Sequence, residues 1–193
     1  MRMLLITAWI VVFGVARAGA QELATANLLA NPSFEDAPGD PKEPPYKWEY
    51  YSSSKRGLTV TSEQHGQGEK CIYMKAQEMA NQYQGIIQNI EVGAGQTYTM
   101  CASVINDKVH PLGGTAKVQM MVEWRNQAGR EISRSAAPLM DYTLSRLRWE
   151  SPCLRKVVAP EGAVRGIFGL HLLDGDKGGK GGLFIDDFSV TSP

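Results

Sequence analysis

Short segments in which apolar and polar residues alternate run through most of the sequence. In residues 97–106 and 116–125 every second side chain is apolar, and a period of two places such side chains on one face of a β-strand. Turns rich in glycine and proline separate these segments, and no long stretch has the 3.6-residue period of a helix. The expected strands cover residues 27–36, 47–53, 58–63, 70–76, 84–92, 96–106, 116–125, 131–135, 147–157, 165–173 and 183–190. This pattern predicts an all-β fold of the sandwich or jelly-roll class.

One carboxylate in the last expected strand needs a partner. As a strand, residues 183–190 place Phe184, Asp186, Phe188 and Val190 on one face, and three apolar side chains on a face direct it into a core. An unpaired buried carboxylate costs several kcal/mol. Asp186 therefore requires a cation, a set of backbone N–H donors, or a position at the solvent-exposed end of the strand.

The first twenty residues are typical of an export signal. Arg2 supplies a positive charge, residues 4–15 form an apolar run, and Ala18-Gly19-Ala20 has the small residues of a cleavage site. The apolar run is short for a membrane span, so a cleaved signal is favoured over a retained anchor. We expect residues 21–193 to be one domain, without a membrane span, that is secreted or periplasmic.

The charge balance of the expected mature chain narrows the class of partner. Loss of Arg2 and Arg17 leaves 18 basic and 20 acidic residues, a net charge near −2. This balance gives no electrostatic basis for binding nucleic acid or acidic lipid. A neutral partner is therefore expected.

The three cysteines, Cys71, Cys101 and Cys153, permit more than one interpretation. Export allows a disulfide, and an odd count leaves one thiol over. No CxxC spacing indicates zinc. One bridge and three separately buried thiols are both compatible with the residues alone.

Two terminal motifs are similar to those of carbohydrate-binding modules. Residues 27–35 (NLLANPSFE) and 184–190 (FIDDFSV) resemble the ends of modules of families four, nine and twenty-two. Residues 93–100 (GAGQTYTM) are similar to a strand entry of that fold, and Trp149 and the turn at 159–163 resemble further landmarks. The resemblance covers nearly all of residues 21–193. It implies a galactose-binding-like jelly roll, built as a two-sheet antiparallel β-sandwich.

The resemblance also implies which strands share a sheet. One sheet would hold residues 70–77, 183–190, 97–106 and 147–157, and the other 84–92, 165–173, 116–125 and 130–135. Cys101 and Cys153 would then lie on neighbouring strands of the first sheet. A disulfide between them is the resulting hypothesis, with Cys71 left as a buried thiol.

A structural Ca²⁺ that ties the first strand to the last is a further implication of the resemblance. Glu35 and Asp186 would supply carboxylate oxygens, and Ser33 and the Gly68–Lys70 turn would supply backbone carbonyl groups. Such hard oxygen ligands suit Ca²⁺ better than zinc or copper. The alternative is that Glu35 and Asp186 only cap loops or pair with Lys70.

The outer side of the second sheet is where such modules bind sugars. Sugar recognition needs flat apolar surface for pyranose C–H groups and planar polar groups for hydroxyls. The candidate ligand-binding residues on that side are Tyr51, Gln88, Met121, Glu123, Arg134 and His171. Each has a structural alternative: Gln88 could tie strand ends, and Glu123 could belong to a solvated face.

Nothing in the sequence marks a catalytic centre. His65, His110 and His171 have neither a nucleophile elbow nor metal-ligand spacing near them. Glu123 and Glu131 are the only conceivable pair of carboxylates for glycoside hydrolysis.

Three functions remain, and the preferred one is a secreted, non-catalytic protein that binds a poly- or oligosaccharide. A structural or protein-interaction jelly roll with a scaffold partner is the alternative, favoured by the sparse aromatic residues on the binding face. A small hydrolase or lyase is third.

Overall fold

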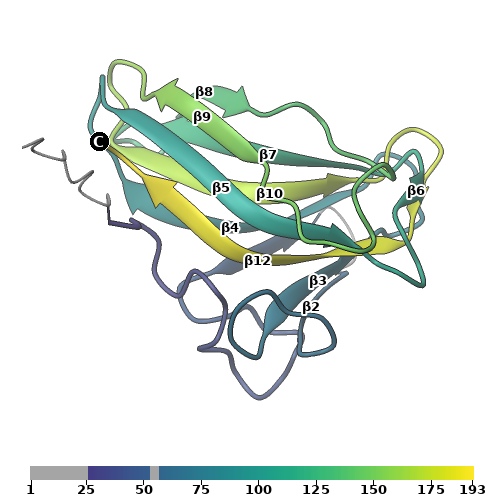
Figure 1. Ribbon diagram of the computed structural model, residues 1–193. Helices are drawn as coiled ribbons and strands as arrows, with labels where there is room; N and C mark the ends of the chain where they lie inside the picture. Colours follow the sequence, from purple (N-terminus) through teal and green to yellow (C-terminus); the bar gives the residue numbers. More distant parts are fainter. Residues whose placement is uncertain (1–25, 53–56) are drawn as a thin grey trace, which may run out of the picture.

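The computed structural model describes residues 26–52 and 57–193, and the expected export signal lies outside these residues. Two five-stranded antiparallel sheets face each other (Figure 1). Sheet A has the order β1-β4-β10-β7-β8, and sheet B the order β2-β3-β12-β5-β9. In the described residues no helix has the length and apolar character needed to cross a membrane.

The strand bounds follow the alternating segments closely. Sheet A contains β1 (Glu49–Ser52), β4 (Tyr83–Glu91), β10 (Arg165–Leu173), β7 (Lys117–Arg125) and β8 (Glu131–Ala136). Sheet B contains β2 (Leu58–Thr61), β3 (Cys71–Lys75), β12 (Gly182–Thr191), β5 (Thr97–Asn106) and β9 (Cys153–Val158). A small ribbon pairs β6 (Gly113–Gly114) with β11 (Gly179–Lys180). The predicted two-sheet sandwich is confirmed. The strands β1 and β2, which were not assigned to either sheet from the sequence, lie at the edges of sheets A and B.

Two expected strands differ from the structure. Residues 27–36 form bends and turns, because Pro32 has no N–H to donate and Asn31 and Phe34 have positive φ angles of 48° and 62°. This segment still lies along β12, where Leu28 N donates to Val190 O at 2.8 Å and Phe188 N donates to Pro32 O at 3.0 Å. In residues 147–157 the regular strand begins only at Cys153.

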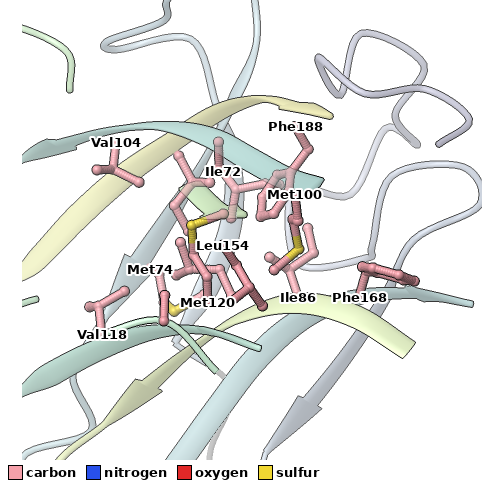
Figure 2. Packing of buried hydrophobic residues seen from close by; sticks show 14 of the residues in the cluster. Ile72, Met74, Ile86, Met100, Val104, Val118, Met120, Leu154, Phe168 and Phe188 are labelled. Carbon is pink, nitrogen blue, oxygen red and sulfur yellow. The ribbon is translucent and has the colours of Figure 1, made fainter. Parts of the chain in front are cut away.

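The core lies between the sheets and uses one face of each strand. On β10 the inward side chains are Phe168, Leu170 and Leu172, all at most 1 % exposed. Figure 2 shows Met74, Met100 and Met120 among the packed aliphatic and aromatic side chains of the core. Burial of these apolar groups is the main favourable contribution to folding.

The shared face predicted for residues 184–190 is wrong, because β12 contains a β-bulge. Leu183 and Ile185 point into the main core, whereas Phe184 packs on the outer face of sheet B, with its ring centroid 4.8 Å from that of Tyr73. The pairing of β12 with β5 shifts register between Asp186 and Ser189. The extra residue reverses the alternation, so Phe188 and Val190 return to the core. Asp186, opposite Ser103 on β5, shares the outer face with Phe184.

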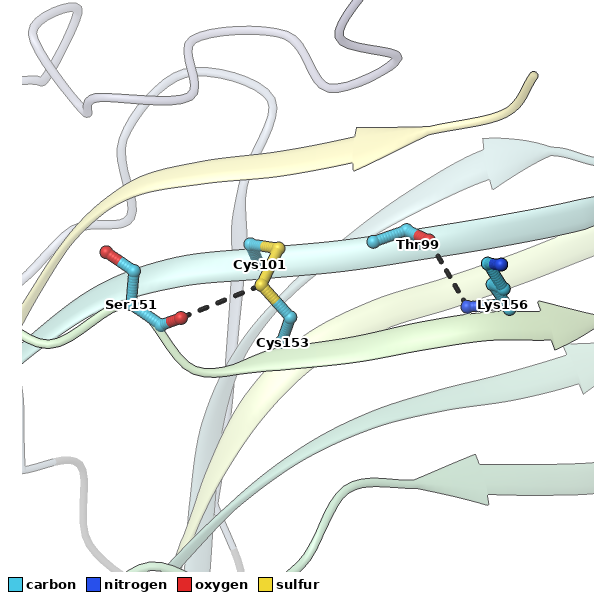
Figure 3. Close-up of a disulfide and its surroundings, with 5 residues drawn as sticks. All are labelled: Thr99, Cys101, Ser151, Cys153 and Lys156. Atoms are coloured by element: carbon cyan, nitrogen blue, oxygen red, sulfur yellow. Dashed lines mark hydrogen bonds between the residues drawn. A yellow bond between two sulfur atoms is a disulfide. The ribbon is translucent and has the colours of Figure 1, made fainter.

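A disulfide joins Cys101 on β5 to Cys153 on β9, with an S–S distance of 2.02 Å (Figure 3). The two residues are direct partners in the strand register. Cys71 is a buried free thiol whose Sγ donates to Gln64 O at 2.6 Å. The pairing that the family resemblance implied is therefore present in the structure.

Removal of this disulfide should lower stability without changing the fold. Because the bridge closes a sequence separation of 52 residues, a Cys101→Ser/Cys153→Ser variant should lose about 2–4 kcal/mol of unfolding free energy. Urea unfolding of the variant and of the oxidised and reduced parent protein measures this loss. After unfolding without reductant, the parent should show one reactive thiol, that of Cys71. Three reactive thiols would contradict the pairing.

Candidate functional site

A groove of about 500 Å³ lies on the outer face of sheet A. Its lining is mostly apolar, with one carboxylate and two guanidinium groups. The lining residues are Tyr51, Tyr83, Ile87, Met121, Glu123, Arg125, Arg134, Ile167, His171 and Leu173. They come from β1, β4, β10, β7 and β8, so the groove crosses every strand of the sheet.

Strand register arranges the lining residues in rows across the sheet. In one row Tyr51 on β1 pairs with Gly85 on β4, which pairs with His171 on β10. In the next outward row Ile87 pairs with Gly169, which pairs with Met121 on β7. In the row after that Ile167 pairs with Glu123, which pairs with Arg134 on β8. Residues far apart in the sequence therefore meet because antiparallel pairing brings their outward positions together.

Two glycines lower the floor of the groove. A Cβ on Gly85 would lie 2.7 Å from Tyr51 Cε1, and a Cβ on Gly169 would lie 2.6 Å from Ile87 Cγ2. The Tyr51 ring and the Ile87 side chain can thus lie flat over the backbone of neighbouring strands. Side chains at these two positions would fill the groove.

Aromatic side chains form one end of the groove. The ring centroid of Tyr51 lies 5.7 Å from that of Tyr83 and 5.2 Å from that of His171. The Tyr51 hydroxyl is hydrogen-bonded to His171 Nδ1. Burial raises the pKa of Tyr51 above its usual value and, with a smaller effect of Arg134, lowers the pKa of His171 to about 4. At neutral pH both side chains are therefore uncharged.

Ion pairs form the other end. Glu123 pairs with Arg125 and, at 3.2 Å, with Arg134. Arg134 also pairs with Glu131 at 2.8 Å. Arg125 uses its terminal nitrogens on Glu123 and on the carbonyl group of Gly129, while its buried Nε has no hydrogen-bond partner within residues 26–52 and 57–193. This end thus offers planar polar groups whose charges compensate one another.

Five of the six predicted ligand-binding residues line this groove: Tyr51, Met121, Glu123, Arg134 and His171. Gln88 does not. It lies opposite Phe168 on the inward side of β4, is 5 % exposed, and exchanges two hydrogen bonds with Ala30, at 2.8 and 2.9 Å. Gln88 instead ties the irregular first segment to sheet A, the structural role that the sequence left open.

Sequence reasoning missed five lining residues: Tyr83, Ile87, Arg125, Ile167 and Leu173. A signal was available for three of them. On β10 the inward positions of Phe168, Leu170 and Leu172 turn Ile167 and Leu173 outward, and on β4 the inward Ile86 turns Ile87 outward. Outward apolar residues in register on neighbouring strands indicate a recessed apolar surface.

Four of the five predicted metal-binding residues, Glu35, Gly68, Lys70 and Asp186, lie at one loop on the other sheet. Asp186 is fully buried, and its Oδ2 accepts hydrogen bonds from the N–H groups of Gly66, at 2.8 Å, and Gln67, at 3.3 Å. Glu35 Oε1 accepts from the N–H groups of Glu69 and Lys70, both at 3.0 Å. The 66–70 loop therefore joins the first segment to β12. Lys70 Nζ donates to the Glu35 backbone carbonyl group, at 2.7 Å.

The electrostatics of this cluster are compatible with a cation. Burial, followed by the neighbouring Asp187, raises the pKa of Asp186 to about 6, and burial and Glu35 raise that of Asp187. A Cβ on Gly66 would lie 3.0 Å from Asp187 Oδ2 and 3.2 Å from Asp186 Oδ2, so the loop approaches both carboxylates closely. Among the described residues no three His, Cys, Asp or Glu side chains are grouped to hold a metal. A cation here would need backbone carbonyl groups as well, as the Ser33, Gly68 and Lys70 assignment supposes.

The imidazole of His171 should titrate near pH 4, which an NMR titration measures. Because the unfolded chain binds this proton near pH 6.5 and the folded chain only near pH 4, stability should fall as the pH drops through that interval. A His171→Gln variant should lose less stability over the same interval. An imidazole titrating near 6.5 would contradict the burial of His171 against Tyr51.

Comparisons with known proteins show what this architecture resembles. No protein-family model and no curated protein matches the sequence. The carbohydrate-binding module TmCBM61, solved with β-1,4-galactotriose, matches with a TM-score of 0.59 and 21 % identity, over 88 % of this chain and 100 % of that chain.

Two further solved structures match to a similar degree. The CBM22-1 xylan-binding domain of Paenibacillus barcinonensis Xyn10C has a TM-score of 0.59 and 16 % identity, over 88 % and 96 % of the two chains. The enzymatically active domain of bacteriophage CBA120 tailspike protein 4 has a TM-score of 0.61 and 11 % identity, over 86 % of this chain but only 21 % of that one. At such identities the likeness concerns the fold: this chain has the β-sandwich fold of carbohydrate-binding modules.

Proposed function

We propose that the protein is a secreted, non-catalytic module that binds a poly- or oligosaccharide in the groove of sheet A. The observation that carries this proposal is the composition of the groove, which combines tyrosine rings and aliphatic side chains with the Glu123–Arg134 pair. Apolar surface suits the C–H faces of a pyranose, and carboxylate and guanidinium groups suit its hydroxyls. Modules of the same fold bind β-1,4-galactotriose and xylan, which supports a saccharide as the ligand.

The protonation properties of the groove favour binding over catalysis. A general acid or base works best with a pKa near the operating pH. Burial moves the pKa of Tyr51 up and that of His171 down, away from neutrality in both cases. The one conceivable pair of carboxylates, Glu123 and Glu131, is engaged by Arg134.

Secretion is part of the proposal. The disulfide between Cys101 and Cys153 supports an oxidising compartment outside the cytoplasm. The expected signal at residues 1–20 agrees with this location.

The second candidate function is a protein-interaction jelly roll that does not bind sugar. One observation favours it: the described lining of the groove contains tyrosine but no tryptophan, and the Tyr51 and Tyr83 rings are tilted by 50° instead of forming one flat platform. A scaffold protein would then be the partner.

We also propose that Ca²⁺ binds beside Asp186. Glu35 and Asp186 would hold it with carboxylate oxygens, and Ser33, Gly68 and Lys70 with backbone carbonyl groups. The ion would neutralise an acidic cluster in which Asp187 raises the pKa of Asp186 and Glu35 raises that of Asp187.

Loss of a tyrosine ring from the groove should weaken saccharide binding. Tyr51→Ala and Tyr83→Ala should each reduce the affinity for the glycan at least about tenfold, because each removes a large apolar protein surface that would contact the ligand. Affinity gels with β-1,4-galactan and xylan, together with a glycan array, measure this. Tyr142→Ala is the matched control, since Tyr142 is 57 % exposed and lies outside the groove. Absence of binding to every glycan would favour the interaction domain instead.

Calcium should raise the melting temperature of the parent protein, and a chelator should reverse the effect. An Asp186→Asn variant should not respond to either, because the buried carboxylate that holds the ion is gone. A Glu131→Gln variant, altered at a partly exposed carboxylate on sheet A, should respond as the parent does. Equal melting temperatures of the parent with calcium and with chelator would contradict the site.

A further inference from the structure

The floor of the groove is more apolar than recognition of hydroxyl groups requires. Four aliphatic side chains, Ile87, Met121, Ile167 and Leu173, face outward on three adjacent strands and all line the groove. Each is partly buried although it lies on the solvent side of the sheet. An exposed apolar recess of this kind is normally kept for an apolar group of a ligand.

Strand register makes three of these side chains, those of Ile87, Met121 and Ile167, one continuous surface. Ile87 and Met121 flank Gly169 in one row, and Ile167 lies two residues before Gly169 on β10. Ile87 lies over Gly169, since a Cβ there would come 2.6 Å from Ile87 Cγ2. The glycine therefore keeps the aliphatic surface low, and the Tyr51–His171 pair bounds it on one side.

Among the residues that the structure describes, the charged end of the groove gives no preference for an acidic sugar. Glu123 pairs with Arg125 and Arg134, and Arg134 pairs with Glu131, so two carboxylates face two guanidinium groups. His171 is neutral at pH 7 because its pKa is about 4. The groove therefore selects its ligand by apolar contact and hydrogen bonding.

We propose that the groove recognises a methyl group carried by a neutral glycan, either an O-acetyl ester or the C6 methyl of a 6-deoxy sugar. This inference rests on the proposed saccharide-binding function and adds the chemical class of the ligand. The methyl group occupies the floor formed by Ile87, Met121 and Ile167, which excludes water from it. Arg134 lines the same groove with a half-exposed guanidinium group, and an ester carbonyl group is an acceptor for its N–H donors.

The experiment compares two pairs of ligands: one pair differs in the acetyl ester, and the other in the C6 hydroxyl that turns a methyl group into a hydroxymethyl group. Affinity electrophoresis uses acetylated xylan and the same xylan after alkaline removal of its esters, and NMR titration uses L-fucose and L-galactose, which differ only at C6. Burial of one methyl group predicts a preference of about fourfold for the methyl-bearing member of a pair. Preference in the xylan pair assigns the ester, and preference in the sugar pair assigns the 6-deoxy group.

Variants separate this floor from general effects on the sheet. Ile167→Thr replaces the ethyl branch on Cβ by a hydroxyl while keeping a β-branched residue in the strand. This variant should abolish the preference for the methyl-bearing ligand. Ile132→Thr is the control, because Ile132 is a 38 % exposed residue of β8 outside the groove. Equal affinity for both members of both pairs would overturn the inference and leave saccharide binding intact. No binding to any glycan would overturn the proposed function and this inference with it.

Discussion

The alternation of side chains along β10 is the constraint on which both halves of this structure depend. Its inward residues, Phe168, Leu170 and Leu172, pack in the core, and its outward residues include Ile167, His171 and Leu173 in the groove. β10 lies in the centre of sheet A, paired with β4 and β7 over nine positions each. A slip of one residue would place the groove residues in the core and the core residues in solvent, so burial of the core also sets the register of the groove.

Sheet B accommodates a buried carboxylate, that of Asp186. The bulge at Asp186 reverses the alternation of β12, which keeps Phe188 in the core and moves Asp186 under the 66–70 loop. There the N–H groups of Gly66, Gln67 and Asp187 donate to its carboxylate. Of the three partners that the sequence allowed for Asp186, backbone donors are thus present. The same loop binds Glu35, so the first segment is joined to the final strand through its backbone.

Much of the fold could be predicted from the sequence. Most strands pack one of their faces on the core, so apolar and polar residues alternate along them with a period of two. The bulge could not be predicted, since it arises from pairing between β12 and β5 and leaves no mark on the alternation of residues 183–190 alone. Residues 27–36 failed as a strand because Pro32 and two positive φ angles interrupt it. The site was partly predictable. His171 was identified because it alternates with the inward residues Phe168, Leu170 and Leu172. The same alternation turns Ile167 and Leu173 outward and would have indicated an apolar surface there. Gln88 was assigned to the groove by resemblance, whereas its position between the inward Ile86 and Ile90 indicated the opposite face.

Saccharide binding on the outer face of sheet A is the central claim, and backbone NMR tests it most directly. A ¹⁵N-labelled sample would be titrated with the tightest-binding glycan from the array. The account predicts that the largest amide shifts occur at outward positions of β10 and its neighbours, at Ile167, Gly169, His171 and Met121. Shifts confined to the outer face of sheet B, around Tyr73 and Trp149, would contradict it.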